Sequence, residues 1–436
     1  MKKHIFLLFL LLASRGSIAQ NLYFPPLTGN AWDTLSPQSL GWCDQYLDTL
    51  NAYLQINNTK AFLLLKDGKM VHEKYFGTFT RDSLWYWASA GKTLTSFAVG
   101  MAQQEGFLNI TDTTSDYIGT GWTNCTPQQE EKITIRHQLT MTTGLDDGVA
   151  DNHCTLDTCM VYLADAGTRW AYHNAPYTML DSVIESATGM NLNSYLTTRL
   201  KIPTGMDGLF FMVDYDNVFF SRPRSMARFG LMILNHGNWN GTQIMTDTTY
   251  FHDMINTSQQ LNKSYGYLWW LNGKSSFMVP GFQFVIPGYL NPNGPSDLIM
   301  ALGKNGQMLN IVPSQNLIYV RMGDAPGAGD VPITFNDSIW SILNQLMCST
   351  SSVQELQLLV NVRLHPNPAA ENVKISDIPS GCTVALTDIT AKEIFTTRSS
   401  GGEMEISTAG VPSGLYFLRI QLPHGEQTVR KLIVAH

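Results

Sequence analysis

Charged side chains are scarce in this chain of 436 residues: Asp, Glu, Lys and Arg make up 14% of it, against about a quarter in a typical globular protein. The formal net charge is −7, and there is no basic run of the kind that follows a nucleic-acid backbone. The histidines and cysteines lack metal-ligand spacing, since His137, His153 and His173 stand apart. We therefore expect no nucleic-acid partner, no metal and no other cofactor.

Long apolar runs are also missing, apart from one at the start of the chain. Residues 5–13 are apolar, follow Lys2 and Lys3, and precede Ser17-Ile18-Ala19, where small residues flank one position as in a cleavage site. This pattern predicts a secretory signal peptide over residues 1–19 rather than a membrane span. No other stretch is long and apolar enough to be a transmembrane segment. No cysteine directly follows the cleavage point, which argues against a lipid anchor. The expected location is secreted or at the cell surface.

The length is too great for one ordinary domain and predicts a large domain, residues 20–349, followed by a small one. In the large domain, strand patterns at both ends enclose a region of helical periodicity. This order predicts an α+β fold, in which one antiparallel sheet is flanked by helices and carries an inserted helical lobe. The expected helices are near 40–54, 89–106, 177–188, 226–235 and 336–348, and the expected strands are 61–65, 70–76, 297–303, 307–312 and 317–323.

A change in composition marks the end of the chain. Residues 350–362 are predicted to be a linker that opens on a Ser- and Thr-rich stretch. From residue 363 to 436 apolar residues alternate in short runs, as in Val373/Ile375 and Val384/Leu386. Short strands at regular spacing predict a small β-sandwich.

Ser89 and Lys92 are three residues apart, a spacing that places both on one side of a helical turn. A serine hydroxyl is a poor nucleophile until a base takes its proton. A lysine amine can be that base if burial lowers its pKa. The spacing therefore predicts a nucleophile and its base, although alone it also fits a surface helix with serine as its cap.

Two further motifs follow in order along the chain, Tyr172-His173-Asn174 and Lys304-Asn305-Gly306-Gln307. Together with Ser89 and Lys92 they resemble the Ser-x-x-Lys, Tyr-x-Asn and Lys-Thr-Gly signature of the serine β-lactamase and penicillin-binding-protein superfamily. Connecting segments resemble its class C-like branch, which includes esterases and 6-aminohexanoate-dimer hydrolases. The similar segments are 135–145, 225–231, 237–241 and 265–270.

The resemblance implies a catalytic cleft between sheet and lobe, with Ser89 as the nucleophile that forms an acyl-enzyme. Lys92 and Tyr172 are the candidate bases. A phenol with a pKa near 10 would need cationic lysines beside it to ionise at neutral pH. Asn174 would orient the substrate carbonyl or Lys92, and Lys304 would pair with a substrate carboxylate or steady Tyr172.

The resemblance also suggests two backbone N–H donors for the developing oxyanion, those of Ser89 and Gln307. Gly306 would let the substrate backbone approach the strand closely. Asn305 stands where the β-lactamases commonly have threonine, which weakens the case for recognition of a β-lactam carboxylate. The stretch Gly303-x-x-Gly306-Gln307 is more similar to the esterase and amide-hydrolase branch.

Two pairs of residues near these motifs have two interpretations each. Asp146 and Asp147 could face an amine on the substrate or cap a loop. Trp269 and Trp270 could line the cleft or be buried in the sheet. The sequence leaves these alternatives open.

Six cysteines in an exported chain permit disulfides. Cys154 and Cys159 are close enough in sequence to close one small loop. The resemblance further implies a Cys43–Cys348 pair, because the first and last helices of that fold pack together. Cys125 and Cys382 have no obvious partner, and buried free thiols are the alternative for every pair except the first.

The C-terminal segment resembles the sorting domain of the type IX secretion system of Bacteroidota. The similar features are Pro366-Asn-Pro368, the strand Gly414–Leu418 and the basic final strand. Ala391 stands where that family usually has glycine. The resemblance implies the type IX secretion machinery as a partner, and an accessory or carbohydrate-binding sandwich is the alternative.

These observations predict an exported serine hydrolase that cleaves a small ester, amide or peptide-like substrate. A true β-lactamase or a D-alanyl carboxypeptidase is the alternative within the same class. A second alternative is a penicillin-binding or sensor module that is acylated once without turnover. The presence of Tyr172 argues against the sensor, because deacylation needs a base as much as acylation does.

Overall fold

The computed structural model describes residues 22–327, 332–348, 362–388, 392–422 and 427–436. The predicted signal peptide lies outside the described residues, as does the predicted linker apart from Val362. The chain divides after Leu343 into two compact units, and each is described by itself. Among the described residues, no helix is long and apolar enough to cross a membrane.

A six-stranded antiparallel sheet forms the centre of the first unit, in the order β2-β1-β13-β12-β11-β8. Its first hairpin turns at Asp67 and Gly68, between the strands that the sequence predicts at 61–65 and 70–76. Residues 61–65 are fully buried because helices cover both faces of the sheet. The strands are β1 (Thr59–Lys66), β2 (Lys69–Tyr75), β8 (Trp270–Leu271), β11 (Ile299–Gly303), β12 (Gln307–Val312) and β13 (Leu317–Gly323).

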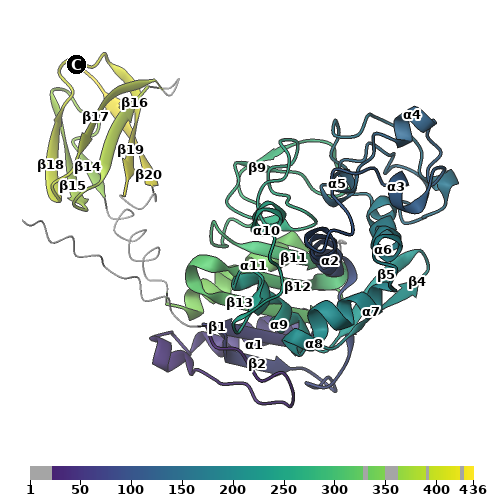
Figure 1. Cartoon of the computed structure of the whole chain (residues 1–436). Helices are drawn as coiled ribbons and strands as arrows, with labels where there is room; N and C mark the ends of the chain where they lie inside the picture. The colour runs from purple at the N-terminus through teal and green to yellow at the C-terminus, as the bar shows by residue number, and fades with distance from the viewer. Residues whose placement is uncertain (1–21, 328–331, 349–361, 389–391, 423–426) are drawn as a thin grey trace, which may run out of the picture. The chain divides into compact units, whose positions relative to one another are not determined.

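Helix α9 (Pro223–Leu234) covers one face of this sheet (Figure 1). It packs so closely that a Cβ atom on Gly230 would lie 2.7 Å from Leu309 Cδ1. Helices α1 (Tyr46–Ile56) and α11 (Ile333–Leu346) lie together on the opposite face, where the rings of Tyr53 and Phe335 stack 5.6 Å apart.

The start of α11 differs from the start near residue 336 that the sequence predicts for the last helix of this unit. The helix begins earlier, at Ile333, and Asn336 is fully buried. The Asn336 amide donates to Asn310 Oδ1 at 3.2 Å, and its oxygen accepts from the Tyr319 hydroxyl. Asparagine often caps helices, but here it pairs with buried polar groups of the sheet. Only the tertiary structure reveals this use.

A helical lobe is inserted between the strands and lies to one side of the sheet (Figure 1). Its two longest helices, α2 (Lys92–Gln104) and α6 (Asn174–Thr188), pack against each other. A small antiparallel sheet in the order β3-β5-β4 borders the lobe. The remaining elements of this unit are α3 (Ser115–Ile118), α4 (Pro127–Glu130), α5 (Ile135–Leu139), α7 (Leu192–Leu196), α8 (Ile202–Thr204), α10 (Thr248–Met254), β3 (Trp85–Tyr86), β4 (Leu209–Val213), β5 (Asp216–Ser221), β6 (Asn238–Trp239), β7 (Thr242–Gln243), β9 (Ser276–Phe277) and β10 (Ile286–Pro287).

The second unit is a β-sandwich of a three-stranded sheet, β14-β15-β18, and a four-stranded sheet, β17-β16-β19-β20. Val373, Ile375, Val384 and Leu386, which alternate in the sequence, are fully buried between the sheets. The predicted sandwich and the α+β class of the whole chain are therefore confirmed. The strands are β14 (Arg363–His365), β15 (Asn372–Ile378), β16 (Thr383–Thr387), β17 (Glu393–Arg398), β18 (Gly402–Ser407), β19 (Gly414–Gln421) and β20 (Gln427–Val434).

The predicted disulfide between Cys154 and Cys159 is present, with Cα atoms 5.9 Å apart. Cys43 and Cys348 are each disulfide-bonded as well. Cys125 and Cys382 are free thiols.

A buried arginine connects the end of the central sheet to the turn after β11. Arg321 on β13 is fully buried, and burial lowers its pKa to about 10. Its Nη1 donates to the carbonyl oxygens of Asn305 (2.6 Å) and Gly306 (2.9 Å). Its Nη2 donates to those of Asn57 (2.7 Å) and Asp324 (2.9 Å). These carbonyl groups satisfy the guanidinium where water cannot reach it.

We expect Arg321→Met to destabilise the first unit by about 3 kcal/mol or more, because one buried and three partly buried carbonyl groups lose their donor. Urea unfolding followed by tryptophan fluorescence measures this, since all ten tryptophans lie between Trp32 and Trp340. Lys132→Met is the control, because its exposed ion pair with Asp165 is worth less than about 1 kcal/mol. Equal effects of the two substitutions would contradict the prediction.

Candidate functional site

Ser89 lies in a short 3₁₀ turn, η2 (Ala88–Gly91), which leads directly into α2. Lys92 is the first residue of that helix, and its Nζ lies 3.2 Å from Ser89 Oγ. The end of β11 presses against this turn: a Cβ atom on Gly303 would lie 2.4 Å from the carbonyl oxygen of Trp87. Glycine at position 303 therefore lets the sheet approach the Ser89 turn.

Lys92 is only 3% exposed although it carries an amine. Its Nζ also donates to Asn174 Oδ1 at 2.8 Å and lies 3.7 Å from the centre of the Tyr177 ring. Burial lowers the pKa of Lys92 to about 7, against a weaker opposing effect of the carboxylates of Asp216 and Asp181. At neutral pH a large fraction of Lys92 is therefore uncharged and able to accept a proton.

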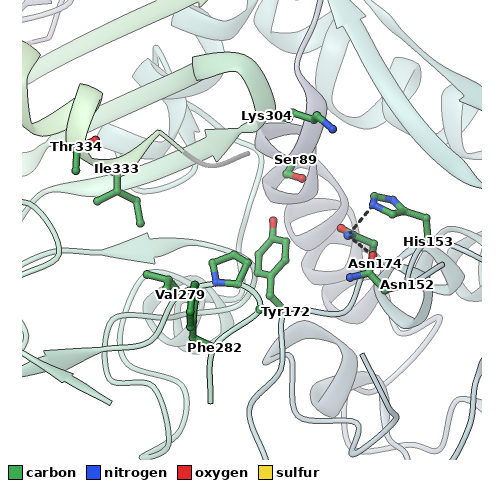
Figure 2. Close-up of a pocket in the computed structure, with 12 residues that line it drawn as sticks. Ser89, Asn152, His153, Tyr172, Asn174, Val279, Phe282, Lys304, Ile333 and Thr334 are labelled. Carbon is green, nitrogen blue, oxygen red and sulfur yellow. Dashed lines mark hydrogen bonds between the residues drawn. The ribbon is translucent and has the colours of Figure 1, made fainter. Parts of the chain in front are cut away.

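Tyr172 precedes α6, and its hydroxyl points toward Ser89 (Figure 2). Its ring stacks on Trp270 at 5.8 Å with an angle of 17°. Burial raises the pKa of Tyr172, although a hydrogen bond with Ser89 opposes the shift. Tyr172 is thus a neutral phenol at neutral pH rather than a phenolate. Trp269 and Trp270 are buried, as the second of their two interpretations proposes.

Asn174 links Lys92 to a histidine that we did not single out as a site residue from the sequence. Its Nδ2 lies 3.1 Å from His153 Nε2 (Figure 2). His153 Nδ1 lies 2.9 Å from Asp216 Oδ1. A chain of polar contacts therefore runs from Asp216 through His153 and Asn174 to Lys92 and Ser89. His153 directly precedes Cys154, one of the two cysteines of the Cys154–Cys159 disulfide.

No signal in the sequence distinguishes His153 from the other histidines, because its partners come from distant parts of the chain. Asp216 begins β5, and Asn174 begins α6. Asn174 Nδ2 also donates to Asn152 Oδ1 at 3.2 Å.

Of the substrate-binding residues predicted in the third motif, Lys304 lines the cavities beside Ser89, whereas Asn305 and Gly306 do not. Asn305 adopts a left-handed backbone conformation (φ 61°), and its amide donates to the Tyr86 hydroxyl at 2.8 Å. A Cβ atom on Gly306 would lie 2.6 Å from Arg321 Nη1, so Gly306 makes room for this arginine rather than for a substrate. Asn305 and Gly306 are not among the residues that line the two cavities beside Ser89.

Gln307 also differs from its predicted role as an oxyanion donor. It is fully buried, pairs with Gly303 in the sheet, and is not a lining residue of either cavity. Its side-chain amide donates to the carbonyl oxygen of Gly323 at 2.7 Å. The physical reason is the turn at residues 304–306, after which Gln307 pairs with Gly303 inside the sheet.

Two cavities meet at Ser89, of about 580 Å³ and 340 Å³. Ser89, His153, Asn174 and Lys304 line both of them. Tyr172 lines the first cavity and Lys92 the second. The other residues of the first cavity are Asn152, Val279, Pro280, Gly281, Phe282, Ile333 and Thr334, and those of the second are Tyr86, Ala88, Tyr177, Val213, Asp216, Asn217, Val218 and Phe220.

The two aspartates considered as substrate contacts make local contacts instead. Asp146 Oδ1 accepts from the N–H of Gly148 at 2.9 Å, and Asp147 pairs with Arg169. Within the described ranges, no group of three or more His, Cys, Asp or Glu side chains is arranged to hold a metal ion.

Comparison with known families agrees with this geometry. Residues 58–329, more than half of the chain, match the Beta-lactamase family, and residues 363–435 match the Secretion system C-terminal sorting domain. The chain belongs to the β-lactamase family, whose members are serine hydrolases, and carries a type IX sorting domain at its C-terminus.

Individual relatives are distant. Penicillin-binding protein 4* of Bacillus subtilis (strain 168) is 26% identical over 37% of this chain, which spans 39% of that protein. "Putative penicillin-binding protein PbpX" of the same organism is 22% identical over 71% of this chain and 81% of its own length. The solved structure "Putative 6-aminohexanoate-dimer hydrolase from Bacillus anthracis" is 19% identical, with a TM-score of 0.57 over 75% of this chain and 90% of that one. At this identity the structural likeness shows the fold.

We expect Lys92 to titrate near pH 7, because burial disfavours its charged form. Asp181→Asn should move this pKa lower, since it removes a buried carboxyl group whose ionised form favours protonated Lys92; burial raises the pKa of Asp181 itself to about 7, so the change is largest above that pH. NMR titration of isotope-labelled lysine measures both values. Asp165→Asn, which removes an exposed carboxylate paired with Lys132, should leave Lys92 unchanged. Titration of Lys92 above pH 9 in all three proteins would refute the prediction.

Proposed function

We propose that this protein is an exported serine hydrolase that cleaves a small ester or amide through an acyl-Ser89 intermediate. The observation that carries the proposal is the buried Lys92, whose Nζ lies 3.2 Å from Ser89 Oγ and whose pKa is lowered to about 7. A partly neutral amine at hydrogen-bond distance is what activation of a serine hydroxyl requires.

In acylation, neutral Lys92 takes the proton of Ser89, and Ser89 Oγ attacks the substrate carbonyl carbon. Collapse of the tetrahedral intermediate breaks the bond to the leaving group. Tyr172, a neutral phenol held toward Ser89, donates its proton to the leaving group (Figure 2). Protonated Lys92 then returns a proton to Tyr172. Deacylation runs the same transfers in reverse, with a water molecule as the nucleophile.

The oxyanion formed in these steps needs two preorganised donors. We assign one to the backbone N–H of Ser89, in the η2 turn that precedes α2. For the second we replace Gln307 by Lys304, the residue that follows Gly303. Support comes from the close approach of Gly303 to the Ser89 turn and from the position of Lys304 in both cavity walls.

Asn174, Asp216 and His153 act as positioning residues in this proposal. Asn174 holds Lys92 through its amide oxygen, and His153 fixes the orientation of that amide. Asp216 accepts from His153 and favours protonated Lys92. The carboxylate thus stabilises the cation that forms when Lys92 takes the proton of Ser89.

We favour an ester or amide over a β-lactam substrate because of Asn305. Its side chain is held by the Tyr86 hydroxyl, and it is not one of the lining residues of the cavities. The hydroxyl that a threonine would offer to a substrate carboxylate is thus absent at this position. Lys304 remains as a cationic group for a polar substituent of the substrate.

A true β-lactamase or D-alanyl carboxypeptidase is the second candidate. It is favoured by the two relatives, both of which bear penicillin-binding-protein names. A sensor that is acylated without turnover is less well supported, because Tyr172 and Lys92 provide proton carriers for deacylation.

Export depends on the second unit in this proposal. A type IX sorting domain indicates secretion or display at the cell surface. We propose that a signal peptide over residues 1–19 precedes the catalytic domain, 20–349, and that a linker, 350–362, joins it to the sorting domain, 363–436.

Ser89→Ala should abolish steady-state hydrolysis of p-nitrophenyl acetate, by about a thousandfold or more in kcat/KM, because the acyl-enzyme can no longer form. A chromogenic cephalosporin is assayed in parallel. Ser194→Ala, an exposed serine on α7, is the matched control and should be fully active. Fast Ser89-dependent cephalosporin cleavage would favour the second candidate, and unchanged ester hydrolysis in Ser89→Ala would refute the proposal.

Deletion of residues 363–436 should keep the protein in the periplasm of a bacterium that has a type IX system, since the machinery then lacks its signal. Fractionation and immunoblotting compare it with the full-length chain. Full-length Ser89→Ala, which keeps the sorting domain, should be exported like the wild type. Export of the shortened chain at the normal level would disprove this role of the second unit.

A further inference from the structure

One face of the small sheet β3-β5-β4 packs into the core at Phe210 and is exposed at Met212, and the other face is directed toward the exterior. Phe210 and Phe219, on the inner face, are buried and their rings lie 5.0 Å apart. The outer face is also apolar, which is unusual for a sheet face without a covering element. Its apolar residues are Leu209, Phe211 and Val213 of β4, Val218 and Phe220 of β5, and Tyr86 of β3, paired across the strands. Asp216 of β5, which pairs with Val213, is the polar residue of this face.

This outer face is continuous with the second cavity. Tyr86, Val213, Val218 and Phe220 line the cavity, together with Ser89. The Phe220 ring lies 6.2 Å from the Tyr86 ring and 5.8 Å from the Phe211 ring, which is 52% exposed. A row of aromatic rings therefore leads from the surface of the protein to the wall of the cavity at Ser89.

Polar groups are confined to the inner end of this surface. There the cavity is lined by Ser89, Lys92, Asn174, Lys304 and Asp216. Strand β4 contributes the exposed apolar side chains Leu209, Phe211 and Val213. A ligand that matches this distribution has one polar, reactive end and one apolar chain. Each methylene group that leaves water on such a surface contributes up to about 0.8 kcal/mol.

We propose that the outer face of β3-β5-β4 binds the acyl chain of the substrate, so that the preferred substrates are esters or amides of medium-chain fatty acids. This inference rests on the proposed function. The assignment to the acyl side follows from Tyr172, which lines only the first of the two cavities. Because Tyr172 protonates the leaving group, the leaving group lies in the first cavity and the acyl chain in the second.

The test is a series of p-nitrophenyl esters with acetyl, butanoyl and octanoyl groups, which share one leaving group. We expect kcat/KM for the octanoate to exceed that for the acetate by about tenfold or more. This ratio is smaller than the one that complete burial of the six additional methylenes would give. Phe211→Ser and Val213→Ser should each lower this ratio about threefold or more, because they replace apolar contact surface with a hydroxyl.

Met212→Ser is the matched control. Met212 lies between these residues on β4 and is 64% exposed, but the alternation of the strand places it on the other face. The octanoate-to-acetate ratio should be unchanged in this variant. A ratio near one in the wild type, or equal losses in the Met212 and Val213 variants, would overturn the inference while leaving Ser89-dependent hydrolysis intact.

A binding measurement separates the inference from the proposed function. Calorimetry with full-length Ser89→Ala should show that octanoate binds about tenfold more tightly than acetate and that Val213→Ser removes most of this difference. If no ester is hydrolysed but octanoate binds in this way, the proposed function fails and the acyl-chain surface stands. If the two acids bind equally, the surface is overturned.

Discussion

The burial of Lys92 is the constraint on which the rest of the site depends. An amine that is 3% exposed and beside Ser89 is held in a place where its charge is costly, and its pKa falls to about 7. The neighbours of Lys92 reduce the cost of burying the amine. Asn174 accepts its hydrogen bond, and the carboxylates of Asp216 and Asp181 stabilise its protonated form. The same burial keeps Tyr172 protonated, so that one low-dielectric environment prepares a proton acceptor and a proton donor.

This environment exists because sheet and lobe close on each other at the Ser89 turn. Gly303 lets β11 approach that turn closely, and Arg321 donates hydrogen bonds to the backbone carbonyl groups of the residues after Lys304. The third motif thus serves the architecture more than the substrate, with Lys304 left in the cavity walls. A left-handed Asn305 and a crowded Gly306 are consequences of the same turn.

Much of the fold follows from local patterns in the sequence. The hairpin of β1 and β2, the helices that contain Lys92 and Asn174, and the alternating strands of the second unit lie where periodicity and turn residues predict them. The start of α11 does not, because Asn336 is as good a helix cap as it is a buried partner for Asn310 and Tyr319. Local sequence cannot distinguish these two uses of an amide side chain.

For the site, the sequence by itself determined which residues are chemically able to act: a serine and a lysine one helical turn apart, followed by a tyrosine, an asparagine and a second lysine. Their spacing within each motif specifies local geometry, and the order of the motifs along the chain was enough to indicate the family. Only the tertiary structure decided that His153 and Asp216 join Asn174, that Gln307 lies away from the cavities, and that the outer face of β4 and β5 continues to Ser89. Those contacts join residues far apart in the chain, and the folded environment fixes both their positions and the pKa of Lys92.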